Sequence, residues 1–260
     1  MFKILQYSFY DLMRSRWSYF YFVFYLLLGF GLLFLNTNLS KAIITLMNII
    51  IVLTPLIGTI FGVMYFYNSR EFVELLLAQP IKRSSIFLGQ FLGVAISLSA
   101  SLVLGIGIPF LIYGITLSPD IFNFVFLLID GALLTFIFVG IAFLISLKSN
   151  DKIKGFGYAI AFWLFFAVIY DGFFLISLIV FEEYPLDKFT LIATMLNPID
   201  LSRILILLKL DISALLGYTG ALFQKFFGTN WGMVTSIGML LIWVFSPIML
   251  ILRAARRKDF

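Results

Sequence analysis

The sequence predicts an all-α integral membrane protein with six transmembrane helices, an N-terminal interfacial helix, a short cytoplasmic helix and an outer helical segment. The composition is the first reason: 62% of the 260 residues are hydrophobic and only 12% are charged. Soluble domains carry about 25% charged residues, and a soluble fold of this length could not bury so much apolar surface. The second reason is that the apolar residues form runs of about 20 residues or more, enough to cross a bilayer. Residues 1–260 are therefore expected to form one transmembrane domain.

Six apolar runs predict the membrane-spanning helices, at residues 17–35, 42–67, 86–115, 121–147, 156–181 and 231–252. The breaks between most of them are short and polar. Helices are favoured over a β-barrel because barrel strands alternate in hydrophobicity over about 10 residues, whereas these runs are longer and apolar on every side.

The distribution of lysine and arginine predicts the orientation, because short loops rich in these residues stay in the cytoplasm. One set of segments holds thirteen of the 18 basic residues: Lys3, Arg14, Arg16, Arg70, Lys82, Arg83, Lys148, Lys152, Lys154, Arg253, Arg256, Arg257 and Lys258. The opposite set holds five: Lys41, Lys188, Arg203, Lys209 and Lys225. Both termini are therefore expected in the cytoplasm, as is Asn150, with Asn38, Asp120 and Glu183 outside. The inward loops account for the net charge of +5, so no nucleic-acid partner is expected.

The chain has no cysteine and no histidine. This excludes disulfides, a Ser-His-Asp triad and any His or Cys metal site. The eight methionines form no tight cluster in the sequence, and the phosphate-binding pattern GxxxxGK[ST] is absent. We therefore expect no catalytic site, metal or other cofactor on this chain. The pair Glu182-Glu183 resembles the acids of glutamate-type membrane proteases, but the histidine partner is missing, which disfavours an intramembrane enzyme.

Residues 1–16 are expected to form a helix lying in the membrane interface. Phe2, Ile4, Leu5 and Phe9 lie largely on one helical face, opposite polar residues, as in interfacial amphipathic helices. The alternative is an ordinary polar start to the first span.

The loop at 68–85 is expected to hold a short amphipathic helix. Asn68 is the predicted N-cap with Glu71 at the N3 position, a capping box, and Pro80 is expected to end the helix. Lys82 and Arg83 then begin the next span. The segment is either a solvated linker or a rigid helix on which another protein pushes.

The outer segment, residues 182–230, is too long for a turn. Asn197 and Pro198 read as an N-cap and first helical position, and Asp200 can pair with Arg203 one turn later as an exposed pair. Two or three amphipathic helices are expected, lying on the outer face or dipping into the membrane. They form either a lid over the bundle or a docking surface.

Two acids, Asp130 and Asp171, fall inside predicted spans, where a charge costs about 2.5–3.5 kcal/mol on insertion scales. They mark either a pathway or switch, or hydrogen bonds between helices. The GxxxG pattern formed by Gly89 and Gly93 predicts close helix packing.

Several of these segments resemble ABC-2 type transporter permeases. The run 74–84, Glu-Leu-Leu-Leu-Ala-Gln-Pro-Ile-Lys-Arg-Ser, followed by Gly89 and Gly93, resembles the loop and following helix of that family. The element 197–203, Asn-Pro-x-Asp-x-x-Arg, is its most specific match, and 150–152 and 162–171 match in order. Within the family the similarity is closest to permeases of the NosDFY type, which serve nitrous oxide reductase maturation in denitrification. Phe72-Val73 and Gln90 depart from the family's usual Gly-Thr and Lys.

The resemblance implies a homodimeric permease of the bacterial inner (cytoplasmic) membrane, with two cytoplasmic ABC ATPase subunits that hold ATP and Mg and a periplasmic copper-handling protein of the NosD type. It implies a cytoplasmic coupling helix whose candidate contact residues are Arg70, Glu71, Glu74, Pro80, Lys82 and Arg83. Asn197, Pro198, Asp200 and Arg203 are the candidate docking surface for the periplasmic partner. A generic ABC-2 exporter of a lipid or small molecule would share these features and remains the alternative.

Overall fold

The computed structural model describes residues 1–36, 38–181, 186–210, 226 and 229–257, and its elements are helical. They are α1 (Phe2–Arg14), α2 (Arg16–Leu35), α3 (Leu39–Asn68), α4 (Arg70–Leu77), α5 (Arg83–Ile112), η1 (Ile115–Leu117), α6 (Ile121–Lys148), α7 (Lys152–Leu164), the π-helix η2 (Phe165–Ile169), α8 (Tyr170–Val180), α9 (Asp187–Leu196), α10 (Pro198–Lys209) and α12 (Asn230–Arg257). Within these residues, six helices are long and apolar enough to span a membrane. The predicted all-α membrane architecture is thus confirmed.

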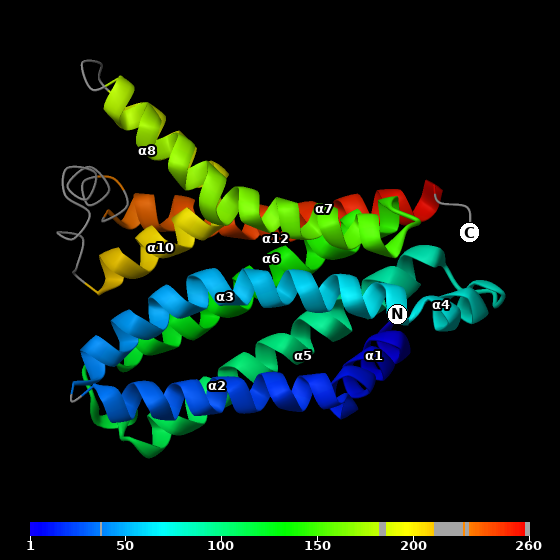
Figure 1. Cartoon of the computed structure of the whole chain (residues 1–260), viewed down its shortest axis with the longest axis horizontal. Helices are drawn as coiled ribbons and strands as arrows, with labels where there is room; N and C mark the ends of the chain where they lie inside the picture. The colour runs from blue at the N-terminus through cyan, green and yellow to red at the C-terminus, as the bar shows by residue number, and fades with distance from the viewer. Residues whose placement is uncertain (37, 182–185, 211–225, 227–228, 258–260) are drawn as a thin grey trace.

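The long helices lie side by side as an elongated bundle (Figure 1). The start of α1, the helix α4 and the last turns of α12 lie at one end, which we name the termini end. The start of α3 and α6 lie at the opposite end, which we name the far end; there the Ser40 hydroxyl donates to the Asp120 carboxylate at 2.5 Å. Asn38 and Asp120 therefore share one end, and Asn150 lies at the other, as the charge distribution predicts.

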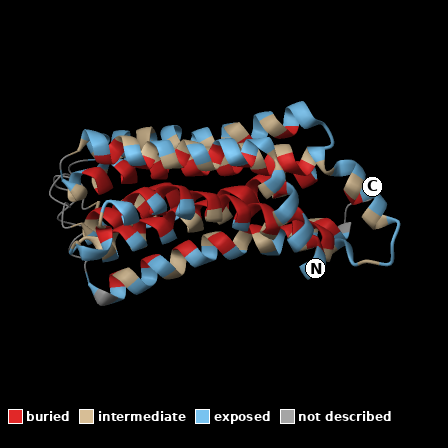
Figure 2. Ribbon diagram, turned by 90° about the horizontal axis from the view of Figure 1, so that it is seen from below, coloured by how far each residue is buried: buried red, intermediate tan, exposed pale blue. Residues whose placement is uncertain are grey.

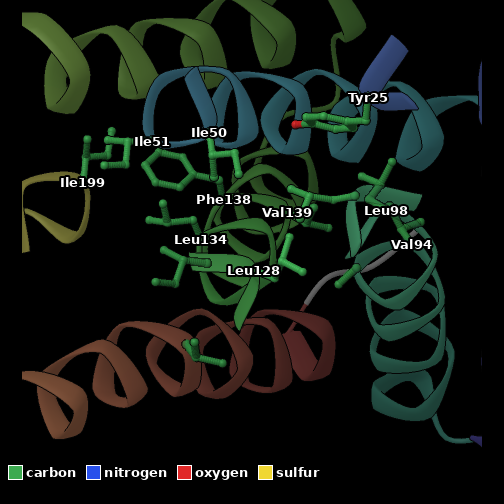
Figure 3. Close-up of a cluster of buried hydrophobic side chains, with 14 of the residues drawn as sticks. Tyr25, Ile50, Ile51, Val94, Leu98, Leu128, Leu134, Phe138, Val139 and Ile199 are labelled. Atoms are coloured by element: carbon green, nitrogen blue, oxygen red, sulfur yellow. The ribbon is translucent and has the colours of Figure 1, made fainter. Parts of the chain in front are cut away.

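The core is formed where α3, α5 and α6 pack against one another and against α2, α10 and α12. Figure 3 shows Tyr25 of α2, Ile50 of α3, Leu98 of α5, Phe138 of α6 and Ile199 of α10 converging on this region. Each of these side chains is at most 1% exposed. Buried residues gather where the helices face one another, and outward faces are exposed (Figure 2). In a bilayer such a core is held by close packing, because lipid tails are as apolar as the side chains.

Two glycines bring α1 against α5. A Cβ added to Gly93 would lie 2.6 Å from the Cβ of Ser8, and one added to Gly89 would lie 3.0 Å from Ile4. The predicted role of the GxxxG pattern in close packing is confirmed. The N-terminal helix forms as expected, but it buries Ile4, Ser8 and Leu12 on the bundle. Phe2, placed on the apolar face by the sequence, is 74% exposed.

Several predicted span boundaries differ from the observed helices by a few residues, and two of these differences have clear backbone reasons. The third span ends at Ile112 rather than at residue 115, because Gly114 adopts a left-handed conformation (φ 91°) and a short 3₁₀ turn follows. The fifth span begins earlier, at Lys152, where the Asp151 carboxylate accepts from two backbone N–H groups. It also contains the π-helix η2, which apolar periodicity does not reveal.

The helices α9 and α10 meet at an angle of 112° across Asn197. Ile199 and Leu201 are at most 1% exposed and α10 packs on α3, α6 and α12, so α10 is inserted into the bundle, whereas α9 keeps Phe189 and Ile192 exposed. The insertion of α10 favours the second of the two arrangements expected for the outer segment. The remainder of that segment, 211–225, lies outside the described residues, as does Glu183.

Candidate functional site

The helix α4, expected from the sequence to be a coupling helix, projects at the termini end (Figure 1). Val73 is 3% exposed and is its buried residue. The ring of Phe72 stacks on that of Tyr7 in α1, with centroids 4.4 Å apart. The helix thus rests on α1 and on the ends of α3 and α5.

The junction between α3 and α4 differs from the predicted capping box. The N-cap is Ser69, which makes no side-chain capping bond, whereas Asn68 is the last residue of α3 and accepts from Lys152 Nζ at 3.2 Å. Asn68 is not the N-cap of α4 because α3 continues through it, and the cap lies one residue later at Ser69. The Ser69 hydroxyl instead accepts from Gln90 Nε2 at 3.0 Å, and Gln90 is fully buried in α5. This bond ties the junction to α5.

The six candidate contact residues, Arg70, Glu71, Glu74, Pro80, Lys82 and Arg83, are all exposed. The structure places them together on α4 and on the turn leading into α5. Arg70 and Glu74 form an ion pair within the helix at 3.1 Å, both about half exposed. Such a pair stabilises a helix by only about 0.2–0.5 kcal/mol, so its charges remain usable by a partner. Pro80 lies beyond the end of α4, which stops at Leu77.

A cavity of about 310 Å³ lies beside this junction, between the α1–α2 turn and the end of α3. Its lining includes Asp11, Arg14, Asn68 and Ser69. Close-packed interiors resist displacement, and on this side the α3–α4 junction is not closely packed. On the other side of the α3 end, the Tyr67 hydroxyl donates to the carbonyls of Ser149 and Asp151, at 3.1 and 3.2 Å.

A polar cluster lies in the far half of the bundle, where the π-helix meets the α9–α10 bend. The Asn197 amide donates to the carbonyl of Phe166 at 2.9 Å and to the Asp200 carboxylate at 2.7 Å. Its oxygen accepts from the backbone N–H of Ile199 at 3.0 Å. The predicted N-cap at Asn197 and first position at Pro198 are thus confirmed, and the same side chain also binds the backbone of the π-helix.

Arg203 connects the two acids of this cluster. Its guanidinium donates to Asp171 at 2.9 Å and to Asp200 at 3.2 Å. Asp200 is 7% exposed, so the prediction of an exposed Asp200–Arg203 pair is wrong: the bend at Asn197 carries the pair into the bundle, where Asp171 joins it. With two carboxylates facing one guanidinium, the cluster fastens α10 to α8. For Asp171, the expected hydrogen bond between helices is what the structure shows.

Asp130 stands apart from this cluster. It is 2% exposed, and neither carboxylate oxygen has a hydrogen-bond partner among the described residues. It lies near the Ser202 hydroxyl of α10, one residue before Arg203. The structure therefore brings Asp171 together with Asn197, Asp200 and Arg203, and leaves Asp130 outside the set.

Sequence reasoning missed three parts of these sites: the Gln90–Ser69 bond, the Asn197–Phe166 bond and the hydrogen bond from the Tyr170 hydroxyl to the Ala193 carbonyl at 2.6 Å. The sequence did hold a signal for the contact between α8 and α10. Asp171 and Arg203 carry opposite charges in apolar surroundings, and a buried charge needs a partner.

Residues 34–260 match the protein family described as ABC-2 family transporter protein. The chain belongs to this family. Two of its relatives are named "Probable ABC transporter permease protein NosY". The one from Stutzerimonas stutzeri is 27% identical over 212 residues, covering 75% of this chain and 76% of the relative. The one from Pseudomonas aeruginosa is 25% identical over 221 residues, covering 78% and 80%.

The chain is accordingly a multi-pass permease subunit of an ABC transporter. Membership of this family implies ATPase partners and dimerisation. The two sites then have distinct places in an ABC-2 permease: α4 and its exposed charges lie at the termini end, and the cluster around Arg203 lies toward the other.

Proposed function

We propose that this permease couples ATP hydrolysis by a cytoplasmic partner ATPase to a periplasmic copper-handling protein of the NosD type, in maturation of the copper site of nitrous oxide reductase. The working complex holds two copies of the permease and two ATPase subunits. ATP and Mg belong to the ATPase, and copper belongs to the periplasmic partner. The termini end faces the cytoplasm of a bacterium whose inner membrane the chain spans.

One observation carries the proposal: a single helix, α3, leads from the far end directly into α4, and α10 packs against it. A tilt of α4 is therefore delivered to the helix that supports α10. The Ser69–Gln90 bond makes α5 move with the junction. ATP-driven closure of the ATPase dimer supplies the tilt, and the α9–α10 bend changes position at the far end.

The cluster keeps the bend in one shape while it moves. Asn197 and Asp200 are buried, with 0% and 7% exposure, so they shape the docking surface from within rather than touching the partner. Arg203 donates to both nearby carboxylates and so competes with a cation for their oxygens. Carboxylate and amide oxygens are also poor ligands for Cu(I), so copper binding falls to the partner.

The first experiment tests the ATPase contact by co-purification of the permease with its partner ATPase and by the coupled ATPase rate. Glu74→Ala and Arg83→Ala should weaken the association or uncouple hydrolysis while the permease stays folded. Lys41→Ala is the matched control, an exposed charge at the far end, and should leave both readouts unchanged. Normal association and coupling in both α4-region variants would remove this region as the contact.

The second experiment separates this function from that of a generic ABC-2 exporter of a lipid or small molecule. The double variant Asp200→Ala, Arg203→Ala should lose retention of the periplasmic partner and the maturation of nitrous oxide reductase. Unchanged maturation would favour the exporter. Copper bound stoichiometrically to the isolated permease would contradict the assignment of copper to the partner.

A further inference from the structure

We infer that the groove between α8 and α9 is a binding site for one acyl chain of a membrane lipid. The groove has a volume of about 260 Å³ and is lined by Tyr170, Phe173, Phe174, Ser177, Phe189, Ile192, Ala193 and Leu196. On each helix the lining residues recur at i, i+3, i+4 and i+7, which is one helical face. The two faces oppose each other, so the groove is built by both helices. This inference does not depend on the proposed function.

The floor and walls of the groove are fixed at defined points. The Tyr170 hydroxyl donates to the Ala193 carbonyl at 2.6 Å, which holds the helices together at the base. Higher up, the rings of Phe174 and Phe189 stack with centroids 6.4 Å apart. Beyond this, α8 diverges from the bundle (Figure 1).

The hydrogen-bonding groups of the groove are already satisfied. The hydroxyl of Ser177 donates to the carbonyl of Phe173 at 2.7 Å, and that of Tyr170 is bonded to Ala193. The remaining lining side chains are hydrocarbon. An occupant thus needs no polar group, and a polar occupant would be left without partners, which is costly away from water.

The position of the groove places it among lipid tails. Tyr170 and Ser177 stand 18 and 25 residues after Lys152, the start of this span, so the groove runs from about 27 to 38 Å along a helix that rises 1.5 Å per residue. The span extends about 42 Å, so the groove lies in the half of the span nearer the far end. None of residues 165–180 is buried in the described chain, so the described residues of this chain leave this apolar face uncovered.

The rim favours a flexible chain over another protein helix. Phe173 is 64% exposed, Ile192 60% and Leu196 50%. Helices that associate in membranes present small residues that let the backbones approach, whereas these bulky side chains hold a helix away. A lipid tail can pass between them. At about 260 Å³, the groove is slightly smaller than pockets that hold drug-sized ligands, about 300–1,000 Å³, so it takes part of one chain rather than a whole lipid.

The test uses the full permease in nanodiscs that contain phosphatidylethanolamine with a diazirine midway along one acyl chain. After irradiation and proteolysis, mass spectrometry should find α8 and α9 labelled in excess of α7, whose Tyr158 is 62% exposed and which reports ordinary lipid contact. Ser177→Phe fills the groove and should remove that excess. Ile176→Phe adds the same ring on α8 at a residue outside the lining, 57% exposed, and should preserve it.

A second filling variant, Ala193→Leu, reaches the groove from the other wall and should also remove the excess labelling if the first variant folds poorly. Labelling of α8 and α9 no stronger than that of α7, or labelling unchanged by either filling variant, would overturn the inference. A third variant, Phe173→Cys, tests a second copy as the occupant, since the chain has no other cysteine. A disulfide-linked dimer at that position would assign the groove to a copy of this chain instead.

Discussion

The bond between Asp171 and Arg203 joins α8 to α10, and its contribution can be measured with a double-mutant cycle. The variants are Asp171→Asn, Arg203→Gln and the combination. Hydrogen bonds to charged groups contribute about 1.5–3 kcal/mol, while measured values for interhelical bonds in a membrane protein average about 0.6 and reach about 1.7. The 2.9 Å pair is charge-assisted, and both side chains are about 30% exposed, so solvent or headgroup screening lowers its strength. We expect a coupling energy of about 1–1.5 kcal/mol.

The single variants should differ in a defined order. Asp171→Asn removes one charged partner and leaves Arg203 paired with Asp200 at 3.2 Å. Arg203→Gln leaves two carboxylates without a cation. Removing one partner of a fully buried pair costs about 3–5 kcal/mol, and partial exposure reduces this to about 2–3 here. Arg203→Gln should therefore be the more destabilising change.

The assay is unfolding in mixed micelles at increasing SDS, followed by tryptophan fluorescence. Trp243 is a suitable reporter because its indole N–H donates to the Met195 carbonyl and its ring contacts Phe166, both beside the cluster. Lys209→Gln, an exposed charge on the same helix, is the control and should change stability by less than about 0.5 kcal/mol. Additive single effects, within about 0.3–0.5 kcal/mol, or a cost for Asp171→Asn that exceeds that for Arg203→Gln, would refute the reasoning.

Three further predictions follow from other contacts. Gly93→Ala should destabilise the chain by about 1–3 kcal/mol, because its methyl would lie 2.6 Å from the Cβ of Ser8 in α1. The control Gly107→Ala, whose methyl would meet nothing within 4 Å, should be neutral in the same unfolding assay. Equal effects of the two substitutions would contradict the close packing of α1 on α5. Tyr67→Phe should lower stability by about 0.5–1.5 kcal/mol, measured as a drop in the thermal midpoint, because the hydroxyl that links the end of α3 to the α6–α7 turn is lost. An unchanged midpoint would show that this bond is not needed. A single cysteine at Asn150 should react with an impermeant thiol reagent only from the cytoplasm, and one at Asn38 only from outside, whereas the reverse pattern would invert the orientation.

Local signals in the sequence predict local structure well here. The Asn197-Pro198 cap depends on neighbouring backbone groups, and it forms as predicted. The GxxxG pattern likewise predicts close packing, although it does not name α1 as the partner. The capping box at Asn68 fails because a shift of one residue moves the cap to Ser69, and helix boundaries are uncertain by one or two residues.

Non-local contacts lie beyond such reasoning. Asp171 and Arg203 are 32 residues apart, and their meeting requires both the bend at Asn197 and the π-helix before Tyr170. The π-helix leaves no periodic trace, because its residues are apolar on every side, as in the rest of the span. The carboxylate of Asp130, which has no hydrogen-bond partner among the described residues, shows the same limit. The sequence shows that the charge is placed in a span, but only the packing of α10 decides what faces it.

The exposed span α7–η2–α8 has a consequence for the dependence of this protein on bilayer thickness. At 29 residues it is about 42 Å long, which exceeds a hydrocarbon core of about 30 Å, so it must tilt or bend to match the membrane. The described bundle covers little of it, and the bonds from Asn197 and Arg203 hold its middle. Lipids with shorter chains favour a larger tilt, and those bonds must accommodate the rotation. The length of the surrounding acyl chains therefore changes the conformational free energy of the far end, although the protein itself is unchanged.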